Sequence, residues 1–245
     1  MLLNYPSLFY VAMAVLFAGF VRGFSGFGFS MIVMISLSFV LSPAEIVPMI
    51  LLWEVAASTW LLPQVWRHVD WISIGWLLFG VLIGTPIGVF ALTRIPPKPM
   101  QAIIAVAVIL LVVAVWRGFR IGGNVSRVTT GGVGLISGIL NGGATIGGPP
   151  VVLYYYSAKN DLQRARASLI AFFLATDLFA AVICATQGLM TIKGLKLTGM
   201  LLIPLVVGLT LGSRSFFKTD PEVFRRRVMA LLIVLSIASF LQAVI

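Results

Sequence analysis

Residues 138–150 read GILNGGATIGGPP, a run rich in glycine and proline inside an apolar block at about 131–156. A related run, GFSGFGFS at residues 23–30, interrupts another apolar block at about 8–40. Glycine and proline release helical hydrogen bonds, which a membrane-embedded helix tolerates only where protein or a water-filled cavity satisfies the freed groups. We therefore expect each block to be either a broken span or a re-entrant hairpin whose tip lies at membrane depth.

The composition places both breaks in a membrane protein. Of the 245 residues, 60% are hydrophobic and 10% are charged, and the mean hydropathy is +1.09. Soluble domains are about 45–50% apolar and about 25% charged, so an ordinary soluble domain is excluded, as is a disordered chain. The 17 Lys and Arg residues, against 7 Asp and Glu, stand in small groups between apolar runs. That pattern is typical of cytoplasmic loops and not of a nucleic-acid-binding surface.

Eight apolar blocks follow one another along the chain, each with the composition of a helix that is buried in lipid. They run approximately 8–40, 43–65, 71–93, 100–117, 131–156, 166–188, 196–213 and 226–244. The fold class predicted from them is an all-α polytopic membrane protein.

The blocks form two homologous halves of four segments each. The run GFVRGFSGFG at 19–28 aligns with GLISGILNGG at 134–143, and GTPIG at 84–88 aligns with GLTLG at 208–212. Hydropathy repeats of this kind are the common plan of secondary transporters. The predicted domains are an N-terminal transmembrane repeat at 1–117, a connecting loop at 118–130 and a C-terminal transmembrane repeat at 131–245.

The charges of the loops favour one topology. If all eight blocks cross, the basic loop residues divide 6 to 10 between the two sides; if the first and fifth turn back, they divide 12 to 4. The second division fits the positive-inside rule better. It leaves three crossings per half, an odd number, so the two halves are predicted to be inverted repeats, each headed by a Gly-rich broken or re-entrant helix.

The two breaks are the predicted substrate site, because exposed backbone amides and half-helix N-termini carry partial positive charge that suits an anion. Neutral donors stand beside those amides: Ser25, Ser30, Asn141 and Thr145. Glycines there let a ligand approach the backbone closely: Gly26, Gly28, Gly142 and Gly143. The alternative is close helix packing through small residues, the role that we assign to Gly80, Gly84 and Gly88.

Three charged residues lie well inside the apolar blocks, away from the block edges: Arg22, Glu54 and Asp177. Arg22 is either the counter-charge of the substrate, the partner of Glu54 in a structural ion pair, or a side chain that snorkels to the interface. Glu54 and Asp177 lie near the middle of corresponding blocks of the two halves, so we expect them to approach a shared central site. Intramembrane carboxylates often relay protons, which makes both residues candidates for proton coupling. Pairing with Arg22 or with loop arginines is the alternative.

An enzyme is not expected. Residues 23–26 read GFSG, a string found in intramembrane serine proteases, but the single histidine, His68, is predicted in a surface loop beyond the reach of Ser25. One histidine and one cysteine, with no acidic pair at metal spacing, leave no metal site. No cofactor is predicted, and the chain lacks a Walker motif for ATP hydrolysis.

The duplicated breaks, with GGATIGGPP opening the second half, resemble the TauE/SafE family of sulfite exporters, also called the four-toluene-sulfonate uptake permease family. The resemblance covers essentially the whole chain. It implies a site at the residues that match the family's motifs: Gly23, Ser25, Gly26, Gly28, Gly138, Asn141, Gly142, Gly143 and Pro149.

The resemblance also implies a function. It is that of a multi-pass permease which moves a small sulfur-containing anion, such as sulfite, thiosulfate or an organosulfonate, across the bacterial cytoplasmic (inner) membrane without ATP. The expected partners are that anion and the lipid bilayer; proton coupling and homo-oligomer formation stay open. The alternatives are a facilitative anion channel and a transporter of another small organic acid.

Overall fold

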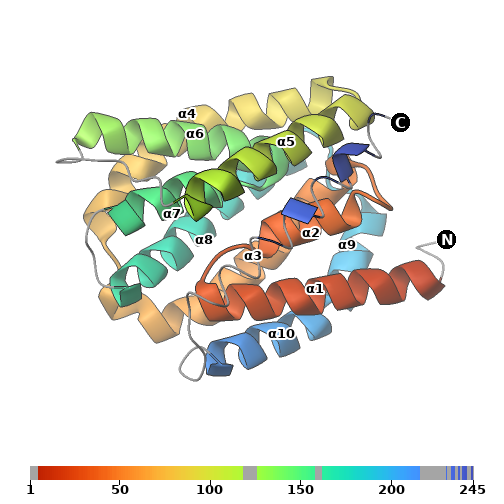
Figure 1. Ribbon diagram of the computed structural model, residues 1–245, viewed down its shortest axis with the longest axis horizontal. Helices are drawn as coiled ribbons and strands as arrows, with labels where there is room; N and C mark the ends of the chain where they lie inside the picture. The colour runs from red at the N-terminus through yellow and green to blue at the C-terminus, as the bar shows by residue number, and fades with distance from the viewer. Residues whose placement is uncertain are drawn as a thin grey trace.

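The computed structural model describes residues 5–117, 126–157 and 162–215, together with residues 230, 233, 234, 237, 239–241 and 244. Every regular element in these residues is a helix (Figure 1), so the all-α prediction is confirmed. The elements are α1 (Tyr5–Ser25), α2 (Phe29–Leu37), α3 (Pro43–Val65), η1 (Trp66–His68), α4 (Trp71–Arg94), α5 (Pro97–Trp116), α6 (Arg127–Ala144), α7 (Gly148–Ser157), α8 (Leu162–Thr186), α9 (Ile192–Met200) and α10 (Leu202–Ser215). Most of the predicted eighth block lies outside the described residues.

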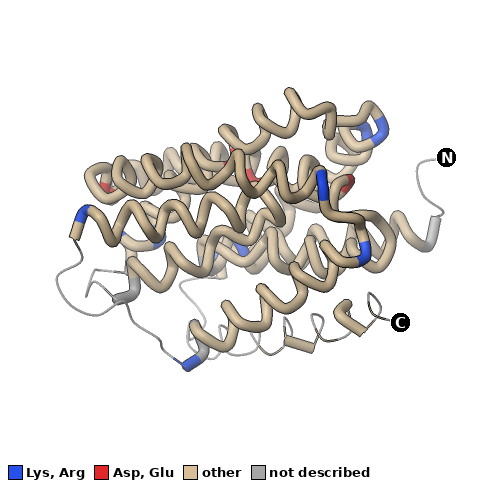
Figure 2. Tube along the Cα trace, turned by 90° about the horizontal axis from the view of Figure 1, so that it is seen from above, with Lys and Arg blue, Asp and Glu red and all other residues tan. Residues whose placement is uncertain are grey.

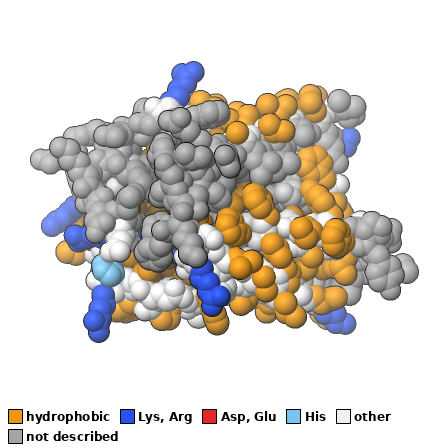
Figure 3. Space-filling view, turned by 60° about the horizontal axis from the view of Figure 1, so that its bottom comes forward, with side chains coloured by type: hydrophobic (Ala, Val, Ile, Leu, Met, Phe, Trp, Pro, Cys, Tyr) orange, Lys and Arg blue, Asp and Glu red, His pale blue; other side chains and the backbone are white. Residues whose placement is uncertain are grey.

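The helices have the length and surface of membrane spans. Among the described residues, five helices are long and apolar enough to cross a membrane, and six spans result if α9 and α10, bent by 43°, count as one. Figure 2 shows most of the described Lys and Arg near the ends of the helix bundle, and Figure 3 shows hydrophobic side chains over much of the described surface. The protein is therefore a multi-pass membrane protein.

Capping residues mark where helices begin. At the start of α3, Ser42 and Glu45 form a capping box in which the Ser42 amide donates to Glu45 at 3.1 Å, and Pro43 occupies the first turn. At the start of α4, Asp70 accepts a hydrogen bond from the Ser73 amide at 3.3 Å. These signals agree with the predicted block boundaries at 43 and 71.

Two boundaries differ from the prediction. The helix α6 begins at Arg127, inside the predicted connecting loop 118–130, because Ser126 caps it by accepting from the Thr129 amide at 3.1 Å. The block predicted at 196–213 is divided at Leu201 into α9 and α10. Pro204 explains the division, since its ring clashes with the carbonyl four residues earlier in a continuous helix.

Each glycine-rich block folds into a helical hairpin. The hydroxyl of Tyr10, early in α1, donates to the carbonyl of Ser36, late in α2, at 3.0 Å. In the second half, Thr130 at the start of α6 lies 3.4 Å from the hydroxyl of Tyr154 near the end of α7. The chain therefore doubles back at both breaks, which span only residues 26–28 and 145–147.

Helices of the two halves pack against each other through their glycine residues. A Cβ on Gly84 of α4 would lie 2.3 Å from the Leu135 carbonyl oxygen of α6, and one on Gly212 of α10 would lie 2.0 Å from the Phe20 carbonyl oxygen of α1. Successive glycines meet successive turns of the partner, so α4 runs parallel to α6 and α1 runs parallel to α10. The predicted packing role of Gly80, Gly84 and Gly88 is confirmed.

Candidate functional site

Arg22 is fully buried in the last turn of α1, and several groups surround its guanidinium. The nitrogen Nη2 lies 3.0 Å from a carboxylate oxygen of Glu54 and donates to the Ser58 hydroxyl at 2.9 Å. The nitrogen Nη1 donates to the Gly26 carbonyl, in the first break. The ring centroid of Phe173 lies 4.5 Å from the guanidinium carbon. The ion pair with Glu54, one of the alternatives for Arg22, is thus present.

Glu54 connects the first hairpin to α3. Its other carboxylate oxygen accepts a hydrogen bond from Ser30, in the first turn of α2, and the residue is 1% exposed. A buried charge is costly unless it is paired and hydrogen-bonded. Arg22 supplies the opposite charge and Ser30 a hydrogen bond to Oε1, while Oε2 has the ion pair but no hydrogen bond. Both contacts connect α1, α2 and α3 around the break.

The second hairpin carries an equivalent polar cluster. The amide nitrogen of Asn141, near the end of α6, donates to Asp177 of α8 at 2.8 Å. The hydroxyl of Ser137, which aligns with Arg22 in the repeat, donates to the Gly147 carbonyl of its own break at 2.6 Å. In each half, therefore, a carboxylate on the helix after the hairpin bonds to a side chain of that hairpin.

The two clusters meet at α8. Phe173, which contacts Arg22, lies one helical turn before Asp177. Asp177 interacts electrostatically with both Glu54 and Arg22. Asp177 therefore lies near Glu54 and Arg22, while the shared central site and a role of either carboxylate in proton coupling stay predictions.

Thr145 ends α6 in a strained conformation. Its φ is +56°, and among the described residues Thr145 alone has a positive φ without being glycine. A β-branched residue in the left-handed region costs about 1–3 kcal/mol, and such strain tends to lie at functional sites. Thr145 is 2% exposed, and its amide donates to the Asn141 carbonyl at 2.8 Å. This residue, predicted to bind substrate, therefore holds the second break in shape beside Asn141.

The predicted site glycines divide into two groups. Gly26 and Gly28 have φ of +80° and +93°, so the first break requires glycine at these positions. Gly23 and Gly142 lie in helix contacts, where a Cβ would stand 2.2 Å from the Leu209 carbonyl oxygen and 2.4 Å from the Thr85 carbonyl oxygen. A Cβ on Gly143 would stand 3.3 Å from the Gly88 carbonyl oxygen. Packing accounts for these last three glycines, and substrate binding by any of the five stays a prediction.

Several buried polar atoms in and near the clusters have no hydrogen-bond partner among the described residues. They include Nε of Arg22, Oδ2 of Asp177 and Oγ1 of Thr85 on α4. Native proteins leave few buried polar atoms unsatisfied, and each one calls for an explanation. Nε of Arg22 and Oδ2 of Asp177 are therefore free to bind a polar ligand.

Three residues that contact the first hairpin were not predicted from the sequence. Ser58 and Phe173 carry no charge or motif that distinguishes them from other residues of an apolar block. Arg166 was counted as a loop charge, yet it lies in α8, half-buried, and donates to the Gly23 carbonyl at 2.8 Å. Its side chain also covers Gly26. Its position at the edge of a block was the one available signal.

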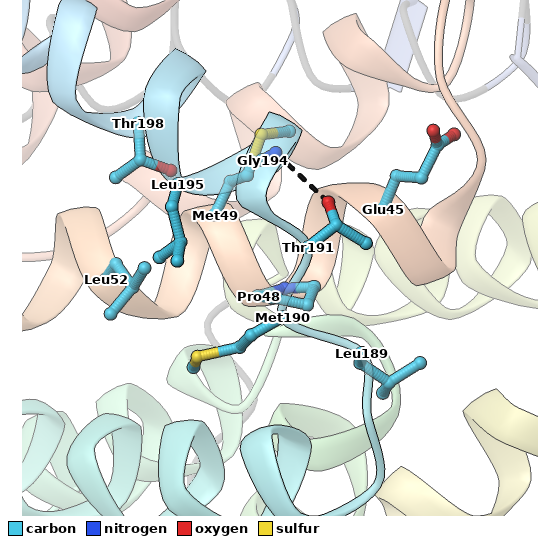
Figure 4. A pocket seen from close by; sticks show the side chains of 10 residues that line it. All are labelled: Glu45, Pro48, Met49, Leu52, Leu189, Met190, Thr191, Gly194, Leu195 and Thr198. Atoms are coloured by element: carbon cyan, nitrogen blue, oxygen red, sulfur yellow. Dashed lines mark hydrogen bonds between the residues drawn. The ribbon is translucent and has the colours of Figure 1, made fainter.

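Other predicted positions lie apart from the clusters or beyond what is described. The side chain of Ser25 lies outside the described residues, so its role in substrate binding stays a prediction. His68 is exposed on η1, as a loop residue is expected to be. Figure 4 shows a small, partly open pocket between α3 and α9, and none of the predicted site residues lines it. Trp53 separates it from the centre, because its indole donates to Thr198 at the pocket wall while its ring packs on Phe29.

Comparison with known proteins supports the motif-based expectation. The sequence model of the family described as "Sulfite exporter TauE/SafE" matches residues 11–239. This chain belongs to the TauE/SafE family. Among its relatives, a Cupriavidus necator protein named "Probable sulfite/organosulfonate exporter TauE" is 25% identical over 227 residues, which cover 90% of this chain and 88% of the relative. No solved structure matches the chain.

Family membership supports the expectation that the chain is a membrane transporter. The TauE/SafE family is one of membrane transporters, which agrees with the expectation that this chain is not an enzyme. The hairpins with Arg22 and Asn141 are thus polar clusters in the core of a TauE/SafE transporter. Such clusters between broken helices are where secondary transporters bind substrate and coupling ions.

Proposed function

We propose that this TauE/SafE chain is a secondary transporter which moves a small sulfur-containing anion, such as sulfite, thiosulfate or an organosulfonate, across the bacterial cytoplasmic membrane. Family membership supports the transport function, and the name of the Cupriavidus necator relative supports the substrate class. The observation that carries the proposal is Arg22, a fully buried cation beside the first break. A buried cation within a transporter marks an ion or substrate pathway.

The proposed site lies where the first hairpin meets α8. The guanidinium of Arg22 supplies the positive charge, and the N-terminus of α2, which has no side-chain cap, supplies backbone amides. Asn141 of the second hairpin reaches the same region through its hydrogen bond to Asp177, and Thr145 lies beside Asn141. Arginine binds oxyanions by two parallel N–H bonds, a geometry that suits sulfite and sulfonate groups.

The proposed membrane arrangement is a pair of inverted repeats with re-entrant hairpins. The first hairpin returns the chain to the side where α1 begins, so α4, two crossings later, runs opposite to α1. Because α6 is parallel to α4, it also runs opposite to α1, its counterpart in the first half. Arg166 of α8 contacts the first tip, so we place that tip towards the basic, cytoplasmic end.

Rocking of one part of the bundle against the other would expose the site to each side in turn. The glycine contacts of α4 with α6 and of α1 with α10 form two tight pairs. Between these pairs, polar contacts such as that of Arg166 with Gly23 connect α8 to the first hairpin. We therefore assign the motion to a shift of the α1–α10 pair relative to the α4–α6 pair.

Ligand binding provides the direct test of the anion site. A ligand that binds the folded state raises the apparent stability by RT ln(1 + [L]/Kd). We expect sulfite, thiosulfate or a sulfonate to raise the unfolding temperature of the detergent-purified protein at fixed ionic strength. The shift should be lost in Asn141→Ala and in Ser25→Ala and kept in Gln64→Ala, an exposed position late in α3. A shift for carboxylates or cations alone would contradict the sulfur-anion assignment.

Proton coupling through Glu54 or Asp177 is the finer part of the proposal. Removing a titratable proton carrier should uncouple transport without abolishing the substrate site. In proteoliposomes with an imposed pH gradient, Glu54→Gln or Asp177→Asn should abolish concentrative uptake and leave anion exchange across the membrane intact. Unchanged pH dependence in both variants would remove proton coupling. Wild-type flux that never concentrates the anion would indicate the facilitative channel instead.

A further inference from the structure

We propose that Glu54 competes with the transported anion for Arg22, so that the anion binds when Glu54 takes up a proton and leaves the guanidinium. Glu54 is then an internal substitute for the substrate, and one proton accompanies each anion bound. This inference rests on the proposed anion site. It adds the identity of the proton carrier and the reason why proton and anion must travel together.

The geometry around Arg22 leaves an oxyanion one place to bind. The nitrogen Nη1 is occupied by the Gly26 carbonyl, and Phe173 lies against the guanidinium. The nitrogen Nη2 is shared by Ser58 and Glu54. A two-point contact of the kind that arginine makes with oxyanions therefore requires the position that the Glu54 carboxylate holds, together with the unpartnered Nε.

The charges of the site keep the anion and an ionised Glu54 from binding Arg22 at the same time. With Glu54 ionised, a second anion on Arg22 would place two negative charges beside one positive charge in a buried region, where repulsion is poorly screened. The groups that face Glu54 are the Arg22 guanidinium from α1, the Ser30 hydroxyl from α2 and the Asp177 carboxyl from α8. Among the described residues, Arg22 is the cation that forms an ion pair with Glu54.

Ser30 binds the Glu54 carboxylate from the side opposite Arg22. Its hydroxyl donates to the carboxylate oxygen that does not face Arg22. A hydrogen bond to the ionised form stabilises that form. When Glu54 takes up a proton, its attraction to Arg22 is lost and the guanidinium gains a free donor. The arriving anion then replaces the lost charge, so proton uptake and anion binding favour each other.

The test measures anion affinity against pH with probes whose charge does not change over the range. Thiosulfate and ethanesulfonate serve this purpose between pH 5.5 and 8. In the wild type, affinity for the better binder of the two should fall by about tenfold per pH unit above the pH at which Glu54 releases its proton, as linkage to one proton requires. In Glu54→Gln, affinity should be independent of pH and at least as high as the wild-type value at pH 5.5.

A second variant keeps the test valid if Glu54→Gln folds poorly. Ser30→Ala removes the hydrogen bond to the ionised carboxylate, so the anion-affinity profile should move to higher pH without a change in slope. The matched control is Ser36→Ala, another buried serine of α2, which engages Tyr10 through its backbone carbonyl. Its profile should coincide with that of the wild type.

Three results would overturn the inference, and they are distinguishable. A Glu54→Gln protein that keeps the wild-type pH profile would show that Glu54 does not compete with the anion. A profile flattened by Asp177→Asn and not by Glu54→Gln would assign the proton to Asp177. If the wild type binds neither probe at any pH, the anion site itself fails, and with it the proposed function.

Discussion

Arg22→Gln is expected to lower the stability of the protein sharply, and the double variant Arg22→Gln/Glu54→Gln is expected to recover most of the loss. Arg22 and Glu54 are 0% and 1% exposed and lie 3.0 Å apart. Removing one member of a buried ion pair costs about 3–5 kcal/mol, because it leaves the other charge uncompensated, whereas replacing both is often close to neutral. Unfolding in detergent at pH 7.5, by heat or by denaturant, measures the cycle.

The same variants separate a structural ion pair from a functional one. A purely structural pair predicts that the double variant, once stable, transports and binds anions like the wild type. The proposed site predicts instead that both Arg22 variants lose thiosulfate binding, because the cation is absent in each. A stable double variant with wild-type affinity would assign Arg22 to stability alone.

Gly84→Ala in α4 is expected to destabilise the protein by about 1–3 kcal/mol or more, although one methyl group is all that is added. The new Cβ would lie 2.3 Å from the Leu135 carbonyl oxygen and 2.9 Å from the Ile139 amide of α6. Backbone atoms cannot rotate away, so α4 and α6 must separate along their length. The measurement is the unfolding temperature of the purified variant, with helix content as a check on folding.

Gly75→Ala provides a control on the same helix. Gly75 is exposed in α4, and a Cβ added there would have no heavy atom of another residue within 4 Å, apart from its own helix backbone and chain neighbours. Alanine there should raise stability by about 0.5–1 kcal/mol through helix propensity. Opposite signs at positions 75 and 84 would attribute the loss to the contact with α6. Equal small effects would contradict the close approach of the two helices.

The sequence was sufficient for the architecture wherever one local signal decided it. Apolar length predicted the helices, and α3 and α4 begin at Pro43 and Trp71, where the predicted blocks begin. The glycine runs predicted both breaks, because few residues tolerate the backbone of Gly26 and Gly28. Arg22, Glu54 and Asp177 stood out because a charge in an apolar block needs a reason to be there.

Features that depend on partners distant in the chain escaped prediction. The pairing of α1 with α10 and of α4 with α6 is set by the fit of small-residue faces, and GxxxG-like spacing does not say which faces meet. For the same reason, Gly23 and Gly142 could not be separated by sequence from glycines that face a ligand. Phe173 and Arg166 joined the site through α8, which only the folded chain brings to the first hairpin.

The glycine contacts of α4 with α6 and of α1 with α10 also set the order in which the newly made chain can assemble. Gly84 meets Leu135 after about 50 further residues have been made, but Gly19 must wait about 190 residues for Gly208. At roughly 5–20 residues per second, the first helix spends about 10–40 seconds in the membrane with its small-residue face uncovered. A chain truncated before residue 202 would keep that face open to the last helices of another copy, a direct route to swapped dimers.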